Sequence, residues 1–121
     1  MTSAGTVMQR CEALGRVSEE PGRLTRSFAS EAMREANELV EGWMRAAGME
    51  VRRDAIGNLI ARYEGRDTET FVLGSHLDTV RDAGKYDGPL GVLVALAVVQ
   101  RLRDTRPAHP QHQGQELVRE G

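Results

Sequence analysis

Hydrophobic residues recur at intervals of three and four between Ser30 and Ala47, which is typical of a helix with one buried face. These positions are Met33, Ala36, Leu39, Val40, Trp43, Met44 and Ala47. Ser30 is suited to cap the amino end, and Glu31 suits the first turn. Arg45 suits the last turn, and Gly48 can end the helix in a left-handed conformation. The pattern therefore predicts a helix over 30–47 whose tryptophan and methionine side chains lie in the core.

Two other segments also predict helices. Residues 1–15 place Met8, Cys11 and Leu14 on one side of a helix. Residues 90–102 are apolar on nearly every helical face, and Pro89 suits the first turn. We therefore expect the second of these helices to be buried.

The remaining periodic segments predict strands. Alternation from Met49 to Arg53, the turn Ile56-Gly57-Asn58 and the extended residues 59–63 predict a hairpin. An apolar run over 70–74 predicts a buried strand. After Arg103 the chain contains two prolines and no sustained period, so residues 104–121 are predicted to form a loop or tail.

The composition is that of an ordinary globular chain. Of its 121 residues, 28% are charged and 40% hydrophobic, which allows one modest domain. The net charge of −2 gives no general attraction to nucleic acid or to an anionic membrane, so we expect neither partner. Cys11 is the only cysteine, which excludes an internal disulfide and makes a reducing cytoplasm the expected location.

The segment Gly74-Ser-His-Leu-Asp-Thr-Val80, followed by Tyr86-Asp-Gly88, carries the strongest chemical signal. His76 and Asp78 are two positions apart, so they point the same way at the carboxyl end of the predicted strand, where open α/β sheets bind ligands. Asp87 can fold back across the loop. An imidazole suits zinc, one carboxylate can hold its other N–H, and another can bind one ion or bridge two.

A plainer interpretation is a histidine at a strand end with two loop carboxylates. We favour a metal site, because two carboxylates and an imidazole between a buried strand and a buried helix are costly to desolvate without a cation. Both interpretations stay open at this point.

Other candidates are weaker. His109, His112 and Glu116 have a helical spacing that suits a second zinc site, but nearby prolines disfavour the helix. Ser75 precedes His76 directly, so on a strand the two side chains point to opposite faces, which argues against a nucleophile pair. We expect Ser75 to be a packing residue.

Residues from about Leu24 to Leu102 resemble the N-terminal part of an allantoate amidohydrolase or N-carbamoyl-L-amino-acid hydrolase. This family of dinuclear-metal amidohydrolases is related to aminoacylases and carboxypeptidase G. The short interval between His76 and Asp87 is typical of this branch and favours ureido substrates over peptides. The similar segments are Leu24-Thr-Arg26, Ala36-Asn-Glu-Leu-Val40, Trp43-Met44, Ala47-Gly48, Asp54-Ala-Ile-Gly-Asn58, Gly74-Ser-His-Leu-Asp-Thr-Val80 and Tyr86-Asp-Gly88.

The resemblance implies an α/β fold, with helices packed on a mixed sheet as in the catalytic domain of zinc exopeptidases. It implies that His76 ligates one metal, Asp87 bridges two, and Asp78 orients His76, with Gly88 at a tight peptide, either cis or trans, after the bridge. Two divalent ions, Zn or Mn, about 3.5–4 Å apart would activate water and polarise the scissile carbonyl. The reaction would be hydrolysis of a linear amide or ureido C–N bond in allantoate or an N-carbamoyl-L-amino acid, by an enzyme that is a homodimer when complete.

The resemblance also implies missing parts. The family's adjacent glutamates, a general base and a ligand, would fall just past Gly121, and its later histidine ligands and its dimerisation and lid domain have no counterpart. We therefore expect an incomplete N-terminal part of the catalytic domain over 1–103. The divergent tail over 104–121 would arise from a frameshift, an altered reading frame or a truncation.

Alone, such a fragment should be inactive and bind at most one metal ion, weakly. Two alternatives stay open. The chain could be a non-catalytic module that binds a metal or a partner, or an inert remnant.

Overall fold

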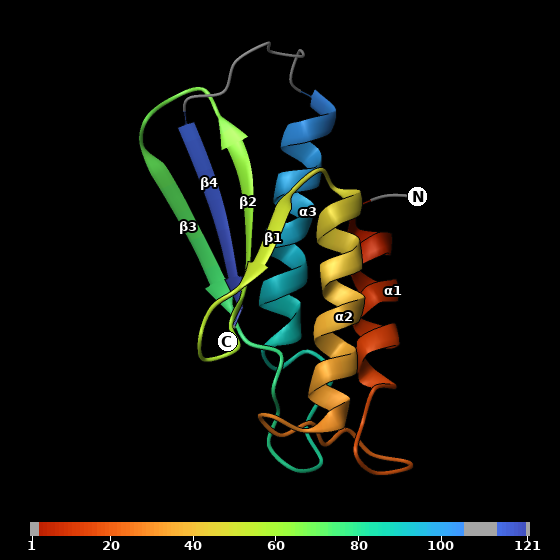
Figure 1. Cartoon of the computed structure of the whole chain (residues 1–121). Helices are drawn as coiled ribbons and strands as arrows, with labels where there is room; N and C mark the ends of the chain where they lie inside the picture. Colours follow the sequence, from red (N-terminus) through yellow and green to blue (C-terminus); the bar gives the residue numbers. More distant parts are fainter. Residues whose placement is uncertain (1–2, 106–113, 121) are drawn as a thin grey trace.

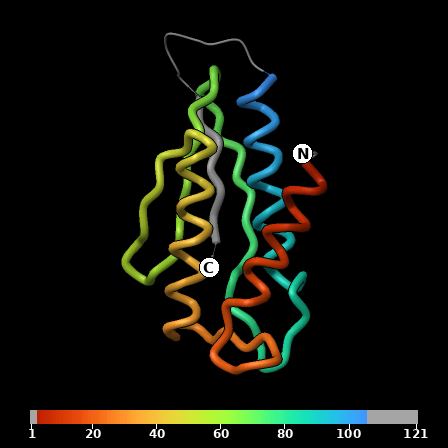
Figure 2. Tube along the Cα trace, turned by 90° about the vertical axis from the view of Figure 1, so that its right-hand side faces the viewer, coloured from red at the N-terminus to blue at the C-terminus, as the bar shows by residue number. Residues whose placement is uncertain are grey.

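In the described part of the chain, three helices lie on one face of a four-stranded sheet (Figure 1). The structure is a computed structural model that describes residues 3–105 and 114–120. The helices are α1 (Ser3–Gly15), α2 (Glu31–Ala46) and α3 (Pro89–Thr105), and the strands are β1 (Glu50–Arg53), β2 (Leu59–Gly65), β3 (Thr70–Ser75) and β4 (Gly114–Glu120). Helices α2 and α3 contact the sheet, and α1 packs on α3 (Figure 2).

The sheet is mixed, with the strand order β1-β2-β4-β3. Strand β2 pairs antiparallel with both β1 and β4, and β3 pairs parallel with β4. This arrangement confirms the predicted α/β fold with helices on a mixed sheet. None of the helices in the described ranges is long and apolar enough to cross a bilayer.

Helix α2 forms where the periodicity predicts it, and both of its ends are capped as expected. The Ser30 hydroxyl accepts a hydrogen bond from the Met33 amide at 3.0 Å, which satisfies one of the free N–H groups of the first turn. At the other end Gly48 has φ +84°, the left-handed conformation that glycine adopts most easily. Met33 and Met44 are buried as predicted, and Trp43 packs against the core while partly exposed.

The hairpin of β1 and β2 is also confirmed. Its turn is held by Asp54, whose carboxylate accepts hydrogen bonds from the amides of Ile56 and Asn58 and from the Asn58 side chain. These bonds lower the pKa of Asp54, the bond from the Asn58 side chain most strongly. Asn58 is therefore the turn residue that the sequence predicts.

The burial of α1 and α3 differs from the prediction in part. Val7 lies in the core with Cys11 and Leu14, whereas Met8 is 46% exposed, because positions 7, 11 and 14 share one helical face. Helix α3 is not buried all round. Its residues Leu90, Val94 and Val98 form an exposed stripe at a spacing of four, since the sheet and α1 cover only its other sides.

Strand β3 was expected to be buried, and this expectation is wrong. Phe71 is 68% and Val72 53% exposed, while Leu73 packs against the core. Within the described residues β3 pairs only with β4, so it is an edge strand, and the helices cover only one face of the sheet.

The expected loop or tail over 104–121 is wrong for residues 114–120, whose backbone forms β4 between β2 and β3. Extended backbone completes hydrogen-bond ladders on both of its sides, and this gain does not depend on hydrophobic periodicity. Helix α3 continues to Thr105, past the predicted boundary at 103. The origin of the tail by frameshift or truncation stays a prediction.

Candidate metal centre

The predicted site begins where β3 ends. His76 follows the last residue of β3, Ser75, and residues 76–88 form the loop that leads into α3. The side chains of His76 and Asp78 remain 47% and 42% exposed, and Asp87 is also exposed. These three side chains are therefore accessible to a ligand from solvent.

The structure brings His76 and Asp78 together. The Nδ1 atom of His76 lies 2.9 Å from the Asp78 carbonyl oxygen and 3.4 Å from its carboxylate oxygen Oδ1. Because a carbonyl oxygen can only accept a hydrogen bond, Nδ1 must carry the proton. A neutral His76 then keeps a lone pair on Nε2, the nitrogen that can ligate a metal.

Gly88 brings the other end of the loop against His76. A Cβ atom built on Gly88 would lie 2.5 Å from Nδ1 and 2.6 Å from the carbonyl oxygen of His76, and φ of Gly88 is +89°. The Ser75 hydroxyl donates to the Gly88 carbonyl at 2.8 Å. Gly88 thus makes a tight turn directly after Asp87, and the cis form of the peptide is not found, because every described peptide bond is trans.

Asp87 does not complete a ligand cluster with the other two residues. Across residues 3–105 and 114–120, no three histidine, cysteine, aspartate or glutamate side chains meet in a group that could hold a metal ion. The structure therefore assembles the predicted pair of His76 and Asp78, and it leaves Asp87 outside such a group. His109 and His112 lie outside the described residues, as does the side chain of Glu116.

Ser75 has the surroundings of a packing residue. Its hydroxyl hydrogen bond goes to the backbone of Gly88, and a Cβ on Gly91 would lie 2.7 Å from its oxygen. This contact explains the glycine in the first turn of α3, and it agrees with the packing role that the sequence favours for Ser75.

Arg26 forms a hydrogen bond to the backbone of the loop. The sequence pattern gave no sign of this contact. Its side chain is fully buried, and its Nε donates to the Leu77 carbonyl at 2.9 Å. Its Nη1 donates to the carbonyls of Leu14 and Val17 at 2.7 and 2.8 Å. Burial lowers the pKa of Arg26, and the negative charge of Asp78 opposes that effect.

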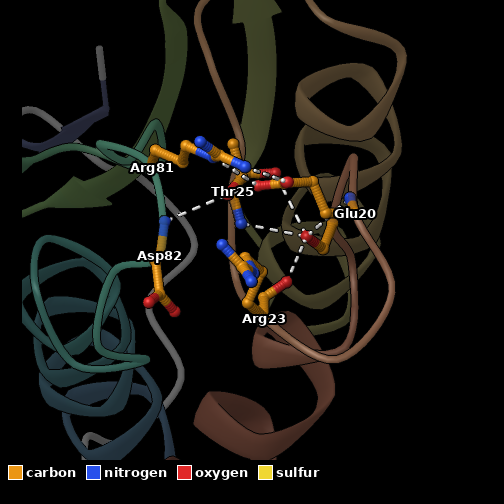
Figure 3. A network of polar contacts seen from close by, with 6 residues as sticks. Glu20, Arg23, Thr25, Arg81 and Asp82 are labelled. Carbon is orange, nitrogen blue, oxygen red and sulfur yellow. Dashed lines mark hydrogen bonds and ion pairs between the residues drawn. The ribbon is translucent and has the colours of Figure 1, made fainter.

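A polar network fixes the outer part of the loop (Figure 3). The Glu20 carboxylate accepts hydrogen bonds from Thr25 and from Arg81, the latter at 3.1 Å, and the Thr25 hydroxyl accepts from the Asp82 amide at 3.0 Å. The bond from Arg81, followed by that from Thr25, lowers the pKa of Glu20. Lys85 forms an ion pair with Glu12 of α1. Basic residues of the loop are therefore tied to acidic residues near the amino end of the chain.

Known proteins are similar to this chain in sequence and in fold. Residues 58–115 match Peptidase family M28. The chain is 45% identical over 108 residues to an N-carbamoyl-L-amino acid amidohydrolase of Geobacillus stearothermophilus, covering 86% of this chain and 26% of that protein. It is 41% identical over 96 residues to an allantoate deiminase of Arabidopsis thaliana, covering 78% of this chain and 18% of that protein.

Solved structures agree with the sequence comparison. A hydantoinase/carbamoylase family amidase from Burkholderia ambifaria superposes with a TM-score of 0.86 at 32% identity, covering 99% of this chain and 29% of that one. A protein of Bacteroides vulgatus assigned as a Zn-dependent exopeptidase has the same fold, with a TM-score of 0.67 at 18% identity. The chain is thus similar, as a segment spanning 18–26% of these two curated relatives' length, to the allantoate deiminases and N-carbamoyl-L-amino acid amidohydrolases.

Proposed function

We propose that this chain is part of a metal-dependent amidohydrolase that hydrolyses a linear amide or ureido C–N bond. The observation that carries the proposal is the contact of His76 Nδ1 with Asp78, which leaves Nε2 free. Metal-binding histidines almost always donate their other ring N–H to a carbonyl or carboxylate in this way. The names of the relatives support allantoate or an N-carbamoyl-L-amino acid as the substrate.

The residues of the loop suit a divalent ion such as Zn²⁺ or Mn²⁺, because an imidazole nitrogen and carboxylate oxygens are ligands that both ions accept. His76 would bind through Nε2, Asp87 through its carboxylate, and Asp78 would hold the His76 ring in place. When bound, a pair of such ions polarises the scissile carbonyl and lowers the pKa of a bound water.

We further propose that the chain by itself holds at most one ion, weakly, and does not turn over substrate. The described residues contain no group of three ligands, whereas catalytic zinc sites use three protein ligands. The other ligands and the general base would come from the remainder of a longer protein. A cytoplasmic location, a homodimeric complete enzyme, and the absence of nucleic-acid or membrane partners belong to the same proposal.

Zinc titration calorimetry tests the metal site. The chain has three histidines, so the titration is done in a His109→Ala/His112→Ala background in which His76 is the only imidazole. We expect weak binding that His76→Ala abolishes and Asp87→Asn weakens. Asp82→Asn, which removes another carboxylate of the same loop, serves as the matched control and should bind normally. Zinc affinity that His76→Ala leaves unchanged would overturn the proposal.

An assay of substrate hydrolysis tests the proposal that the chain by itself does not turn over substrate. The purified chain with Zn²⁺ or Mn²⁺ should hydrolyse neither allantoate nor an N-carbamoyl-L-amino acid at an enzyme-like rate. Turnover at such a rate, lost in His76→Ala, would contradict the proposed inactivity while supporting the metal site.

The exposed apolar residues favour a second candidate function, that of a partner-binding module. Phe71 and Val72 on β3 and the stripe Leu90, Val94 and Val98 on α3 are the surfaces concerned. Association that rises with protein concentration and does not depend on metal would favour this candidate. Metal binding through His76 without any such association would favour the amidohydrolase.

A further inference from the structure

We propose that Arg26 is a positioning residue, which holds the Leu77 carbonyl and thereby keeps the Asp78 carbonyl on Nδ1 of His76. Arg26 belongs to the segment between α1 and α2, far from the loop in sequence. Its role therefore depends on contacts that only the folded chain provides.

Burial is the first support for this role. The side chain of Arg26 has no exposed surface, which is rare for an arginine and costly unless its N–H groups are satisfied. Three backbone carbonyls accept hydrogen bonds from it, at distances between 2.7 and 2.9 Å. Such charge-assisted bonds are stronger than those between neutral groups. The guanidinium is thus fixed in one place and can act as an anchor.

The three carbonyls that accept from Arg26 belong to two separate segments of the chain. Leu14 and Val17 lie at and just after the end of α1, while Leu77 lies between His76 and Asp78. One planar guanidinium therefore sets the position of the His76–Asp78 segment relative to a helix of the core. The Leu77 side chain is itself fully buried in the hydrophobic core.

The backbone of Arg26 fixes the next residue of the loop as well. Its amide donates to the Thr79 hydroxyl at 2.8 Å, and the Thr79 amide donates back to the Arg26 carbonyl at 2.7 Å. Asp78 is therefore held between two neighbours, Leu77 and Thr79, that Arg26 binds. These contacts restrict movement of the Asp78 carbonyl away from Nδ1 of His76.

Charge gives a second reason to connect Arg26 with Asp78. Among the described residues, Nη2 of Arg26 is buried and has no hydrogen-bond partner. Burial lowers the pKa of Arg26, and the negative charge of the Asp78 carboxylate opposes that effect. Arg26 thus places a positive charge behind the residue that orients His76.

The first measurement is the tautomer of His76. If Arg26 only stabilised the fold, replacing it would leave this tautomer unchanged in a folded variant. Nitrogen-15 NMR of the imidazole, without metal and at about pH 8, where an ordinary imidazole is neutral, reports which nitrogen carries the proton. The wild-type chain should show the Nδ1–H form. In Arg26→Met, which keeps the apolar stem and removes every side-chain donor, we expect a mixture of the two forms. The control Arg23→Met removes an exposed arginine of the same segment and should leave the tautomer unchanged.

The second measurement is zinc affinity. This part of the test rests on the proposed function, because it requires a metal site at His76. In the background without His109 and His112, Arg26→Met should weaken zinc binding about 10- to 100-fold, the range typical of residues that orient a metal ligand. Arg26→Lys keeps the charge and part of the hydrogen bonding, so it should restore part of the affinity and of the wild-type tautomer.

Failure of the positioning role of Arg26 and failure of the proposed metal site give different results. If Arg26→Met does not fold, Arg26→Lys and Thr79→Val, which removes the hydroxyl acceptor of the Arg26 amide, decide instead. Folded variants at position 26 with the Nδ1–H form and the zinc affinity unchanged would overturn the role of Arg26. If His76→Ala leaves zinc binding unchanged, the proposed metal site fails, while a tautomer that shifts in the Arg26 variants still supports the positioning role.

Discussion

Gly88 lies so close to His76 that no side chain fits between them. A Cβ atom on Gly88 would lie 2.6 Å from the His76 carbonyl oxygen, and backbone atoms cannot move aside as a flexible side chain can. This contact explains a glycine at the end of the loop, and it leads to the first prediction.

Gly88→Ala should destabilise the chain by about 2–5 kcal/mol. Roughly 1–2 kcal/mol comes from the left-handed backbone and about 1–3 kcal/mol from the clash with His76. Gly57→Ala is a matched control, because φ of Gly57 is +93° and nothing lies within 4 Å of its built Cβ. Urea unfolding measures both variants. Equal losses for the two would show that His76 does not restrict position 88.

Leucine-to-alanine substitutions in α3 test which sides of this helix are covered. Leu96 is fully buried, so Leu96→Ala should cost about 2–5 kcal/mol through lost burial and the cavity left behind. Leu90 is 37% exposed, and Leu90→Ala should cost far less. The comparison uses the free energies of unfolding of the two variants. A large loss for Leu90→Ala would indicate that its stripe is covered in solution, for example by a second copy of the chain.

The Glu20–Arg81 pair predicts a dependence of stability on pH. The pKa of Glu20 is lowered below its ordinary value of 4.5 in the folded chain, so the pair contributes its full stability above that value. The contribution is lost as the pH falls through the lowered pKa. The difference in unfolding free energy between wild type and Glu20→Gln should therefore be largest near neutral pH and shrink in acid. It should also be small, because the Arg81 side chain is largely exposed and the Glu20 side chain is only partly buried.

A double-mutant cycle with Arg81→Gln is the control for this effect. Glu20→Gln should have a smaller effect in the Arg81→Gln background than in the wild type, since the bond from Arg81 is the largest cause of the shift. A difference between wild type and Glu20→Gln that stays constant from neutral pH into acid would contradict the prediction.

Local sequence signals determined a large part of the fold. Helix α2 was predicted to within a residue at each end, because Ser30 and Gly48 act on the backbone immediately beside them. The hairpin followed from alternation and from the short turn at 56–58. The contact between His76 and Asp78 has the same local origin, since the two residues are two positions apart and meet at the end of β3.

The tertiary structure alone decided which surfaces are covered and what fixes the site. An apolar run identifies β3 but not its neighbours, so the exposure of Phe71 and Val72 was missed. Strand β4 lies between β2 and β3 through backbone hydrogen bonds, which hydrophobic periodicity does not report. Arg26 bonds to Leu77 across 51 positions of the chain. Contacts at such separations depend on how the elements pack, whereas the sequence specifies each element through interactions between near neighbours.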